Sequence, residues 1–150
     1  MQAMESSLIR RPRRNRKSPS IRALSQEIHL CPSDFIVPFF VLEGNKHKEE
    51  IPSMPGVFRL SIDLILREAE NYHRFGVPAI ILFPVIPGEC KDEDATESIR
   101  PNNLISRAIR AIKEAIPSLC VITDIALDPY TTHGHDGIVD DCGGEVLNDE

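Results

Sequence analysis

Residues 124–137 bring together, within 14 positions, several side chains that could transfer a proton or bind a cation. They comprise three carboxylates and two imidazoles: Asp124, Asp128, Asp136, His133 and His135. Clustered carboxylates suit a hard cation such as Mg²⁺, a substrate ammonium group, or general acid–base catalysis. Two histidines two positions apart with one aspartate are a weak metal signal. The residues alone therefore indicate a candidate site and leave these chemistries open.

An alternative interpretation is a solvated acidic turn, in which Asp128 is a turn residue before Pro129. The position of Asp124 favours a functional role. It lies within an apolar run, residues 120–127, where an ionisable group is costly unless it is used or paired.

Three apolar runs predict strands buried on both faces, and two periodic segments between them predict helices. The strands are expected at 35–42, 79–86 and 120–127. The first helix starts at an N-cap, Ser61, and stops at Gly76. The second starts at Asn102 or Asn103 and ends at Pro117. Residues 43–60 read as a long polar connection, and residues 1–20 as irregular.

The order β-α-β-α-β predicts an α/β protein with a parallel sheet and right-handed crossovers. Three parallel strands and two helices cannot cover both faces of such a sheet, and a complete barrel of this kind needs about 250 residues. The 150 residues are therefore expected to form the first part of a (β/α)8 TIM barrel, whose active site lies at the carboxyl ends of the strands. The alternative is a small open sheet that uses a partner.

The termini carry opposite charges. Residues 10–17 contain six Lys or Arg, whereas no Lys or Arg follows Asp124 and the net charge is −6. A basic arm of this kind is a disordered tail, a nucleic-acid-binding segment or a docking arm for another subunit. No run of about 18 apolar residues predicts a membrane span and no signal peptide is evident, so the cytoplasm is the expected location.

The four cysteines are expected to be reduced, because a disulfide framework is not typical of this length and composition. Cys31, Cys90 and Cys120 read as ordinary small side chains. Cys142 is the cysteine that lies near the histidines at a zinc-ligand spacing.

The stretch Asp-Ile-Ala-Leu-Asp-Pro-Tyr-Thr-Thr-His-Gly-His-Asp-Gly at 124–137 resembles the metal-loop signature of the porphobilinogen synthase (5-aminolevulinate dehydratase) family. The similarity runs over nearly the whole chain in the family's order. It includes the basic segment and five further motifs, at 51–60, 82–85, 91–94, 121–124 and 146–150.

The resemblance implies a lyase with a (β/α)8 barrel that condenses two molecules of 5-aminolevulinate to porphobilinogen, with loss of water, in tetrapyrrole (haem) synthesis. By position, Asp124 resembles the family's catalytic aspartate at the end of the third strand. Asp128 and Asp136 resemble the carboxylates that hold the second substrate's amino group or a cation. His133 and His135 are expected to shape the loop as neutral hydrogen-bonding groups.

The metal expectation follows from a departure within this loop. Zinc-dependent members carry three cysteines where this sequence has Ala126, Asp128 and Asp136. Thiolates select zinc whereas carboxylates select harder ions, so zinc is disfavoured and Mg²⁺, or also K⁺, is the expected cofactor.

The resemblance also assigns the basic arm. Residues 1–33 are expected to be an oligomerisation arm that packs on an adjacent subunit of a homo-oligomer, octamer or hexamer, and residues 34–150 the N-terminal part of the barrel. Nucleic acid and membrane are not expected as partners.

The family's chemistry requires two lysines that form Schiff bases with the substrates. The five lysines here lie in polar loops, the tail or an exposed helix face, and none matches a catalytic position: Lys17, Lys46, Lys48, Lys91 and Lys113. The catalytic lysines are expected beyond Glu150, so the 150-residue piece alone should be inactive. The alternative is a non-catalytic barrel fragment that acts only by pairing with a partner subunit.

Overall fold

The computed structural model describes residues 13–140 and 145–147, and the chain forms two compact units, Met1–Cys31 and Pro32–Glu150. The first unit contains a short 3-10 helix, η1 (Arg14–Arg16), and helix α1 (Pro19–Leu24). The Ser18 side chain caps α1 by accepting a hydrogen bond from the Ile21 N–H at 3.2 Å. Irregular structure over residues 1–20 was therefore a wrong prediction for the last part of that range. A Ser-Pro pair starts a helix there without the apolar periodicity of a longer one.

The second unit is built on one five-stranded sheet in the order β2-β3-β1-β4-β5. Its strands are β1 (Ile36–Leu42), β2 (Lys48–Glu50), β3 (Phe58–Ser61), β4 (Ala79–Pro84) and β5 (Cys120–Thr123). Four of them, β3, β1, β4 and β5, pair in parallel, and β2 pairs antiparallel with β3. The prediction of an α/β fold with a parallel sheet is confirmed.

The hairpin β2–β3 corrects the prediction that residues 43–60 are an unstructured connection. The three residues of β2 are Lys-Glu-Glu and all are exposed, so no alternating apolar pattern indicates a strand. Pairing decides it: Lys48 lies opposite Leu60, and an ion pair joins Glu49 to Arg59. The sheet consequently has five strands rather than the three that were expected.

Helices α2 (Ile62–Arg74) and α3 (Leu104–Ala115) follow β3 and β4. Asn103, one of the two residues predicted to cap α3, does so, because its side chain accepts a hydrogen bond from the Ser106 N–H at 2.8 Å. Ser61 holds the N-cap position of α2, but its hydroxyl donates to the Asp63 carboxylate at 2.7 Å instead of capping the backbone. Gly76, at φ +92°, lies just beyond the end of α2, where a left-handed conformation favours glycine.

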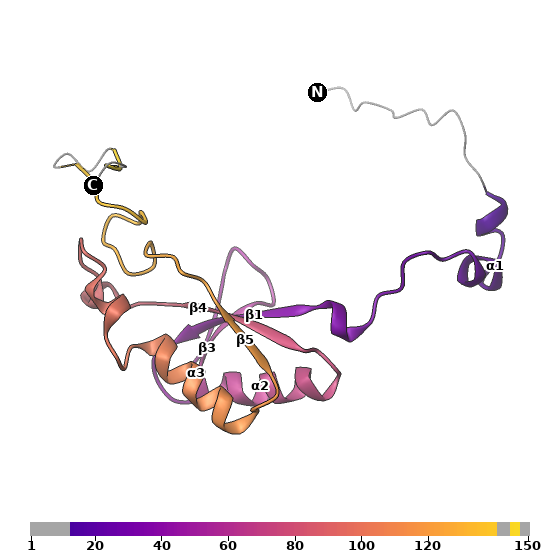
Figure 1. The fold of residues 1–150 in the computed structure, drawn as a ribbon, viewed down its shortest axis with the longest axis horizontal. Coiled ribbons are helices and arrows are strands. Elements are labelled where there is room, and N and C mark those ends of the chain that lie inside the picture. The colour runs from indigo at the N-terminus through magenta and orange to yellow at the C-terminus, as the bar shows by residue number, and fades with distance from the viewer. Residues whose placement is uncertain (1–12, 141–144, 148–150) are drawn as a thin grey trace. The chain divides into compact units, whose positions relative to one another are not determined.

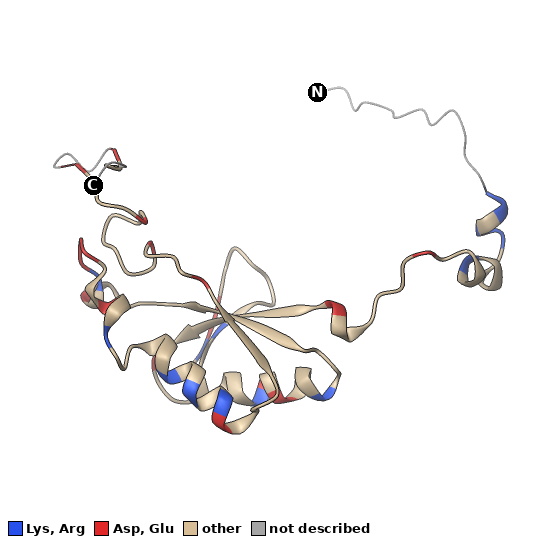
Figure 2. Ribbon diagram, viewed as in Figure 1, with Lys and Arg blue, Asp and Glu red and all other residues tan. Residues whose placement is uncertain are grey.

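Both helices pack on the same face of the sheet, as Figure 1 shows. Alternate strand residues point into this core, among them Val41, Ile80 and Leu82, all with 0% exposure. Burying one such side chain contributes about 1.5–3 kcal/mol. Charged residues lie on the helix surfaces directed away from the sheet (Figure 2). On the opposite face of the sheet, the half-buried rings of Phe40 and Phe83 lie 5.7 Å apart.

Two strands end earlier than predicted. β4 ends at Pro84 rather than at residue 86, and β5 ends at Thr123 rather than at residue 127. Asp124 therefore lies just after its strand, because the ladder stops where the first ionisable side chain appears. Three further 3-10 turns complete the unit: η2 (Pro32–Asp34), η3 (Gly88–Cys90) and η4 (Thr96–Ile99). No helix in the described ranges is long and apolar enough to cross a bilayer.

Candidate functional site

The predicted site lies at the carboxyl edge of the sheet. Because β1, β4 and β5 are parallel, their carboxyl ends lie at the same edge, which is where sites form in parallel α/β folds. The loop after β5, residues 124–140, meets the loop between β4 and α3 there. The Asp92 N–H donates to the Tyr130 carbonyl at 3.3 Å, and the Thr132 N–H donates to the Asp92 carbonyl at 3.0 Å. These two bonds bring together loops that are about 40 residues apart in sequence.

Asp124, Asp128 and Asp136 are all exposed. The carboxylates of Asp124 and Asp128 form no hydrogen bond or ion pair within the described ranges. Ile125, beside Asp124, is 96% exposed. Both carboxylates can therefore accept hydrogen bonds from a ligand without first breaking an internal contact.

Asp136 is held differently. Its Oδ1 atom accepts hydrogen bonds from the Leu127 N–H at 2.6 Å and the Asp128 N–H at 2.9 Å. The N–H of Asp128, then that of Leu127, lowers the pKa of the Asp136 carboxyl below its usual value, and His135 contributes a smaller attraction. One end of the loop is thereby fastened to the other by a carboxylate that stays ionised at neutral pH.

The two histidines contact each other and the neighbouring loop. Their rings stack with centroids 5.8 Å apart. The His133 Nδ1 atom accepts from the His135 N–H at 3.2 Å, and its Nε2 atom lies 3.3 Å from the Glu93 carbonyl. An accepting Nδ1 and a donating Nε2 describe a neutral imidazole. These contacts agree with the loop-shaping role expected of His133, and that role stays a prediction for both histidines.

Two residues of the loop are buried and were not predicted as site residues from the sequence. Tyr130 is 7% exposed and Thr131 is 4% exposed. The Thr131 hydroxyl donates to the His135 carbonyl at 3.0 Å, lies 3.4 Å from the Asp128 carbonyl, and accepts from the Gly134 N–H at 3.1 Å. Burial also raises the pKa of the Tyr130 phenol, with a further contribution from Glu97. No periodic pattern could have indicated these residues, since the loop has none.

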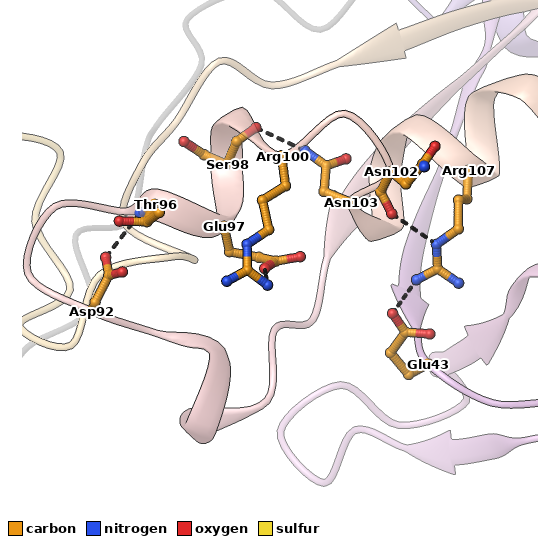
Figure 3. A network of polar contacts seen from close by, with 9 residues as sticks. All are labelled: Glu43, Asp92, Thr96, Glu97, Ser98, Arg100, Asn102, Asn103 and Arg107. Atoms are coloured by element: carbon orange, nitrogen blue, oxygen red, sulfur yellow. Dashed lines mark hydrogen bonds and ion pairs between the residues drawn. The ribbon is translucent and has the colours of Figure 1, made fainter.

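The adjoining loop is braced by side chains (Figure 3). The Asp92 carboxylate accepts from the Thr96 N–H at 2.8 Å, which is the main reason that the pKa of Asp92 lies below its usual value. Asn103 donates to the Ser98 carbonyl at 2.7 Å.

The same brace reaches the end of β1. Arg107 on α3 pairs with Glu43, which directly follows β1 (Figure 3). Polar contacts thus connect segments at the carboxyl ends of β1, β4 and β5. Neither the contact of Asp92 with the 124–140 loop nor the Glu43–Arg107 pair was expected from sequence, because the partners lie far apart along the chain.

A cavity of about 290 Å³ opens beside this edge. Its lining includes Phe40, Arg59, Lys91 and Pro129, so it touches β1, the hairpin and both loops.

Three of the lysines named in the sequence lie as follows in the structure. Lys113 donates to the carbonyls of Pro117 and Leu119, at 2.6 and 2.9 Å. The Lys48 ammonium lies 3.7 Å from the centre of the Phe58 ring. Lys91 lies in the β4–α3 loop rather than on a strand.

The residues do not form a ready metal centre. In the described part of the chain, no three His, Cys, Asp or Glu side chains converge as metal ligands. Asp128 and Asp136 offer the oxygen atoms that Mg²⁺ prefers, but Asp136 already uses one of its oxygens within the loop. Cys142 lies outside the described residues.

The parallel sheet, the helices on one face and the acidic loop at the carboxyl edge define an α/β protein of the (β/α)8-barrel class. Comparison with known proteins gives the family. The family model described as "Delta-aminolevulinic acid dehydratase" matches residues 9–150, and the chain belongs to this family.

Relatives and a solved structure agree with this assignment. The chain is 58% identical to the delta-aminolevulinic acid dehydratase of Chlamydia pneumoniae, over 96% of this chain and 43% of that protein. It is 48% identical to that of Bradyrhizobium diazoefficiens, over 93% of this chain and 39% of the relative. The chain thus spans less than half the length of these relatives.

A crystal structure of the Toxoplasma gondii enzyme, in complex with its reaction product porphobilinogen, superposes with a TM-score of 0.84. The identity is 44%, over 95% of this chain and 40% of that one. The fold is accordingly that of the first β/α units of a (β/α)8 barrel.

Proposed function

We propose that this chain is the N-terminal part of a porphobilinogen synthase, which condenses two molecules of 5-aminolevulinate to porphobilinogen with loss of water. The observation that carries the proposal is the acidic loop 124–137. It follows a parallel strand directly, at the sheet edge where barrel enzymes bind substrate, in a chain that belongs to the dehydratase family.

The loop supplies distinct groups for this reaction. Asp124 is proposed as a catalytic group that accepts or returns a proton at the end of β5. Asp128 and Asp136 are proposed to bind the ammonium group of the second substrate, or a cation beside it. Arg59 and Lys91 give the neighbouring cavity positive charge, which suits the carboxylate of 5-aminolevulinate.

The reaction also requires groups outside this chain. The two Schiff-base lysines are proposed to lie in later barrel strands, beyond Glu150. The sheet order leaves the outer edge of β5 without a partner in the described residues, and a following parallel strand would cover it.

The cation is proposed to be Mg²⁺, or also K⁺, rather than Zn²⁺, because carboxylates replace thiolates in the loop. Since no three ligands converge in the described part, no step of the reaction is assigned to the ion. A zinc-selective chelator should leave activity unchanged. Loss of activity on chelation, restored by Zn²⁺ alone, would contradict this.

Residues 1–33 are proposed as an arm that docks on another copy in a homo-oligomer of the octamer or hexamer type, in the cytoplasm. Within the first unit, α1 buries no residue and Leu24 is 87% exposed. An apolar side chain in that state suits a protein surface better than water. Shortening the arm should lower the oligomeric mass measured by light scattering, and an unchanged mass would refute the docking role.

The decisive experiment extends the reading frame past Glu150, expresses the whole protein and measures pyrrole formation from 5-aminolevulinate. We expect turnover in the whole protein, severe loss in D124N, and none from residues 1–150 alone. A whole protein without turnover would contradict the proposal. A frame that stops at Glu150 would favour the alternative, a barrel fragment that acts by pairing through the open edge of β5.

A further inference from the structure

Thr131 is a buried polar side chain in a loop whose acids are exposed. Its hydroxyl is both a donor and an acceptor, and it uses both capacities within the loop, toward the His135 carbonyl and the Gly134 N–H. Its position beside the Asp128 carbonyl, at 3.4 Å, brings the first half of the loop to the second. The two halves carry Asp128 and Asp136.

The backbone around Thr131 is anchored outside the loop as well. Asp92 forms a parallel bridge with Thr131, through hydrogen bonds to Tyr130 and Thr132. Asp92 is itself fixed, because its carboxylate accepts from the Thr96 N–H (Figure 3). Thr131 therefore joins the acidic loop to the neighbouring β4–α3 loop, which side-chain contacts hold in place.

We propose that Thr131 is a positioning residue of the active site, whose hydroxyl sets the separation of Asp128 and Asp136 at the substrate. This inference rests on the proposed function. Without the hydroxyl, the Gly134 N–H and the His135 carbonyl lose their partner. The turn at Gly134, at φ +74°, then has one constraint fewer, and the loop opens more often.

The chain offers closely matched variants. T131V replaces the hydroxyl by a methyl group of the same shape, T131S keeps the hydroxyl, and T132V makes the same change one residue away. The Thr132 side chain is exposed and forms no hydrogen bond in the described residues, and its N–H contact to Asp92 survives in valine.

In the whole protein we expect T131V to lose about 10- to 100-fold in kcat/KM for pyrrole formation, since small displacements of binding groups are costly. The kcat/KM of T131S and of T132V should stay within about threefold of wild type, because both variants keep a hydroxyl group at position 131. Equal values for T131V and T132V, or equal losses in T131V and T131S, would overturn the proposal.

Hydrogen exchange of residues 127–136, measured by mass spectrometry on the whole protein, tests the loop independently of turnover. T131V should exchange faster there than wild type, whereas T131S and T132V should not. If T131V does not fold, hydrogen exchange of the wild-type protein still tests the proposal. A wild-type loop that exchanges like an unstructured peptide would overturn it. A whole protein without pyrrole formation would refute the proposed function instead, and the exchange result would remain interpretable.

Discussion

The sheet with its helices and the acidic loop are held by different forces. Residues 36–123 are stabilised by apolar burial, with Ile65, Ile80, Leu82 and Ile112 all at 0% exposure. In the loop, residues 124–140, the side chains of Asp124, Ile125, Asp128 and Asp136 are exposed. The loop's conformation depends on a few polar contacts of Asp136, Thr131 and His133. The candidate site residues thus lie on a loop whose conformation can change when a single hydrogen bond is lost.

This difference separates stability from function. The stabilisation from apolar burial is distributed over many side chains of the sheet and helices. The strand ends therefore keep their positions when the conformation of the loop changes. The loop gains ligand-accessible carboxylates because it contributes little to the core, as is general for sites on loops over a rigid scaffold.

The largest expected effect is a loss of folding stability when the core beneath the sheet is altered. L82A removes a fully buried side chain of β4 and should destabilise the protein by about 2–5 kcal/mol, through lost transfer energy and the cavity left behind. The control I125A changes a side chain that is 96% exposed and should stay within about 0.5 kcal/mol. Chemical denaturation of the whole protein measures both. Similar midpoints would show that β4 is not packed as described.

The next prediction addresses the loop. D128N removes one exposed negative charge and should lower kcat/KM for pyrrole formation by about 10²-fold, an effect typical of one preorganised electrostatic contact. Its unfolding midpoint should not change, because the carboxylate forms no internal contact in the described part.

The control for D128N is E93Q, which removes an exposed charge from the neighbouring loop but keeps its backbone contact with His133. It should leave kcat/KM within about twofold, as expected for a solvated charge. A D128N enzyme as active as E93Q would remove Asp128 from the site.

A smaller effect concerns the junction of the two regions. N103A removes the cap of α3 and the bond to the Ser98 carbonyl, and should cost about 1–2 kcal/mol. N103D keeps the acceptor for the Ser106 N–H and should recover part of this loss. Thermal unfolding compares the two, and equal midpoints would mean that the cap contributes nothing.

The smallest effect is a pH dependence of the loop. The pKa of Asp136 is lowered in the folded protein, so its stabilising contribution is present above the ordinary Asp value of about 3.9. It is lost as the pH falls from there through the lower folded pKa. The gap in unfolding temperature between wild type and D136A should therefore narrow in acid. D136N keeps the acceptor oxygen, so its gap should be smaller. A gap that widens toward acid would contradict the assigned contacts.

Much of the scaffold could be predicted from sequence. Apolar runs located β1 and β4, periodicity located α2 and α3, and the cap at Asn103 was found from its residue type. These features depend on neighbours along the chain, so local patterns contain them. The family resemblance of residues 9–150 was also present in local motifs.

Other features were decided by contacts between distant residues. β2 is a strand because β3 pairs with it, and its own residues are polar and exposed. In the candidate site, the sequence supplied the acids, but tertiary structure distinguished them. Both Asp128 and Asp136 are exposed, but only the Asp136 carboxylate accepts hydrogen bonds from two N–H groups of the loop.

By itself, the sequence determined the order β1-α2-β4-α3-β5 and the chemical groups of the loop, because propensity, periodicity and residue type act over a few positions. Only the tertiary structure decided that Thr131 is buried, that Asp92 bridges to its loop and that Glu43 meets Arg107. The physical reason is that a hydrogen bond or ion pair between distant residues forms only after the sheet has brought their loops to the same edge.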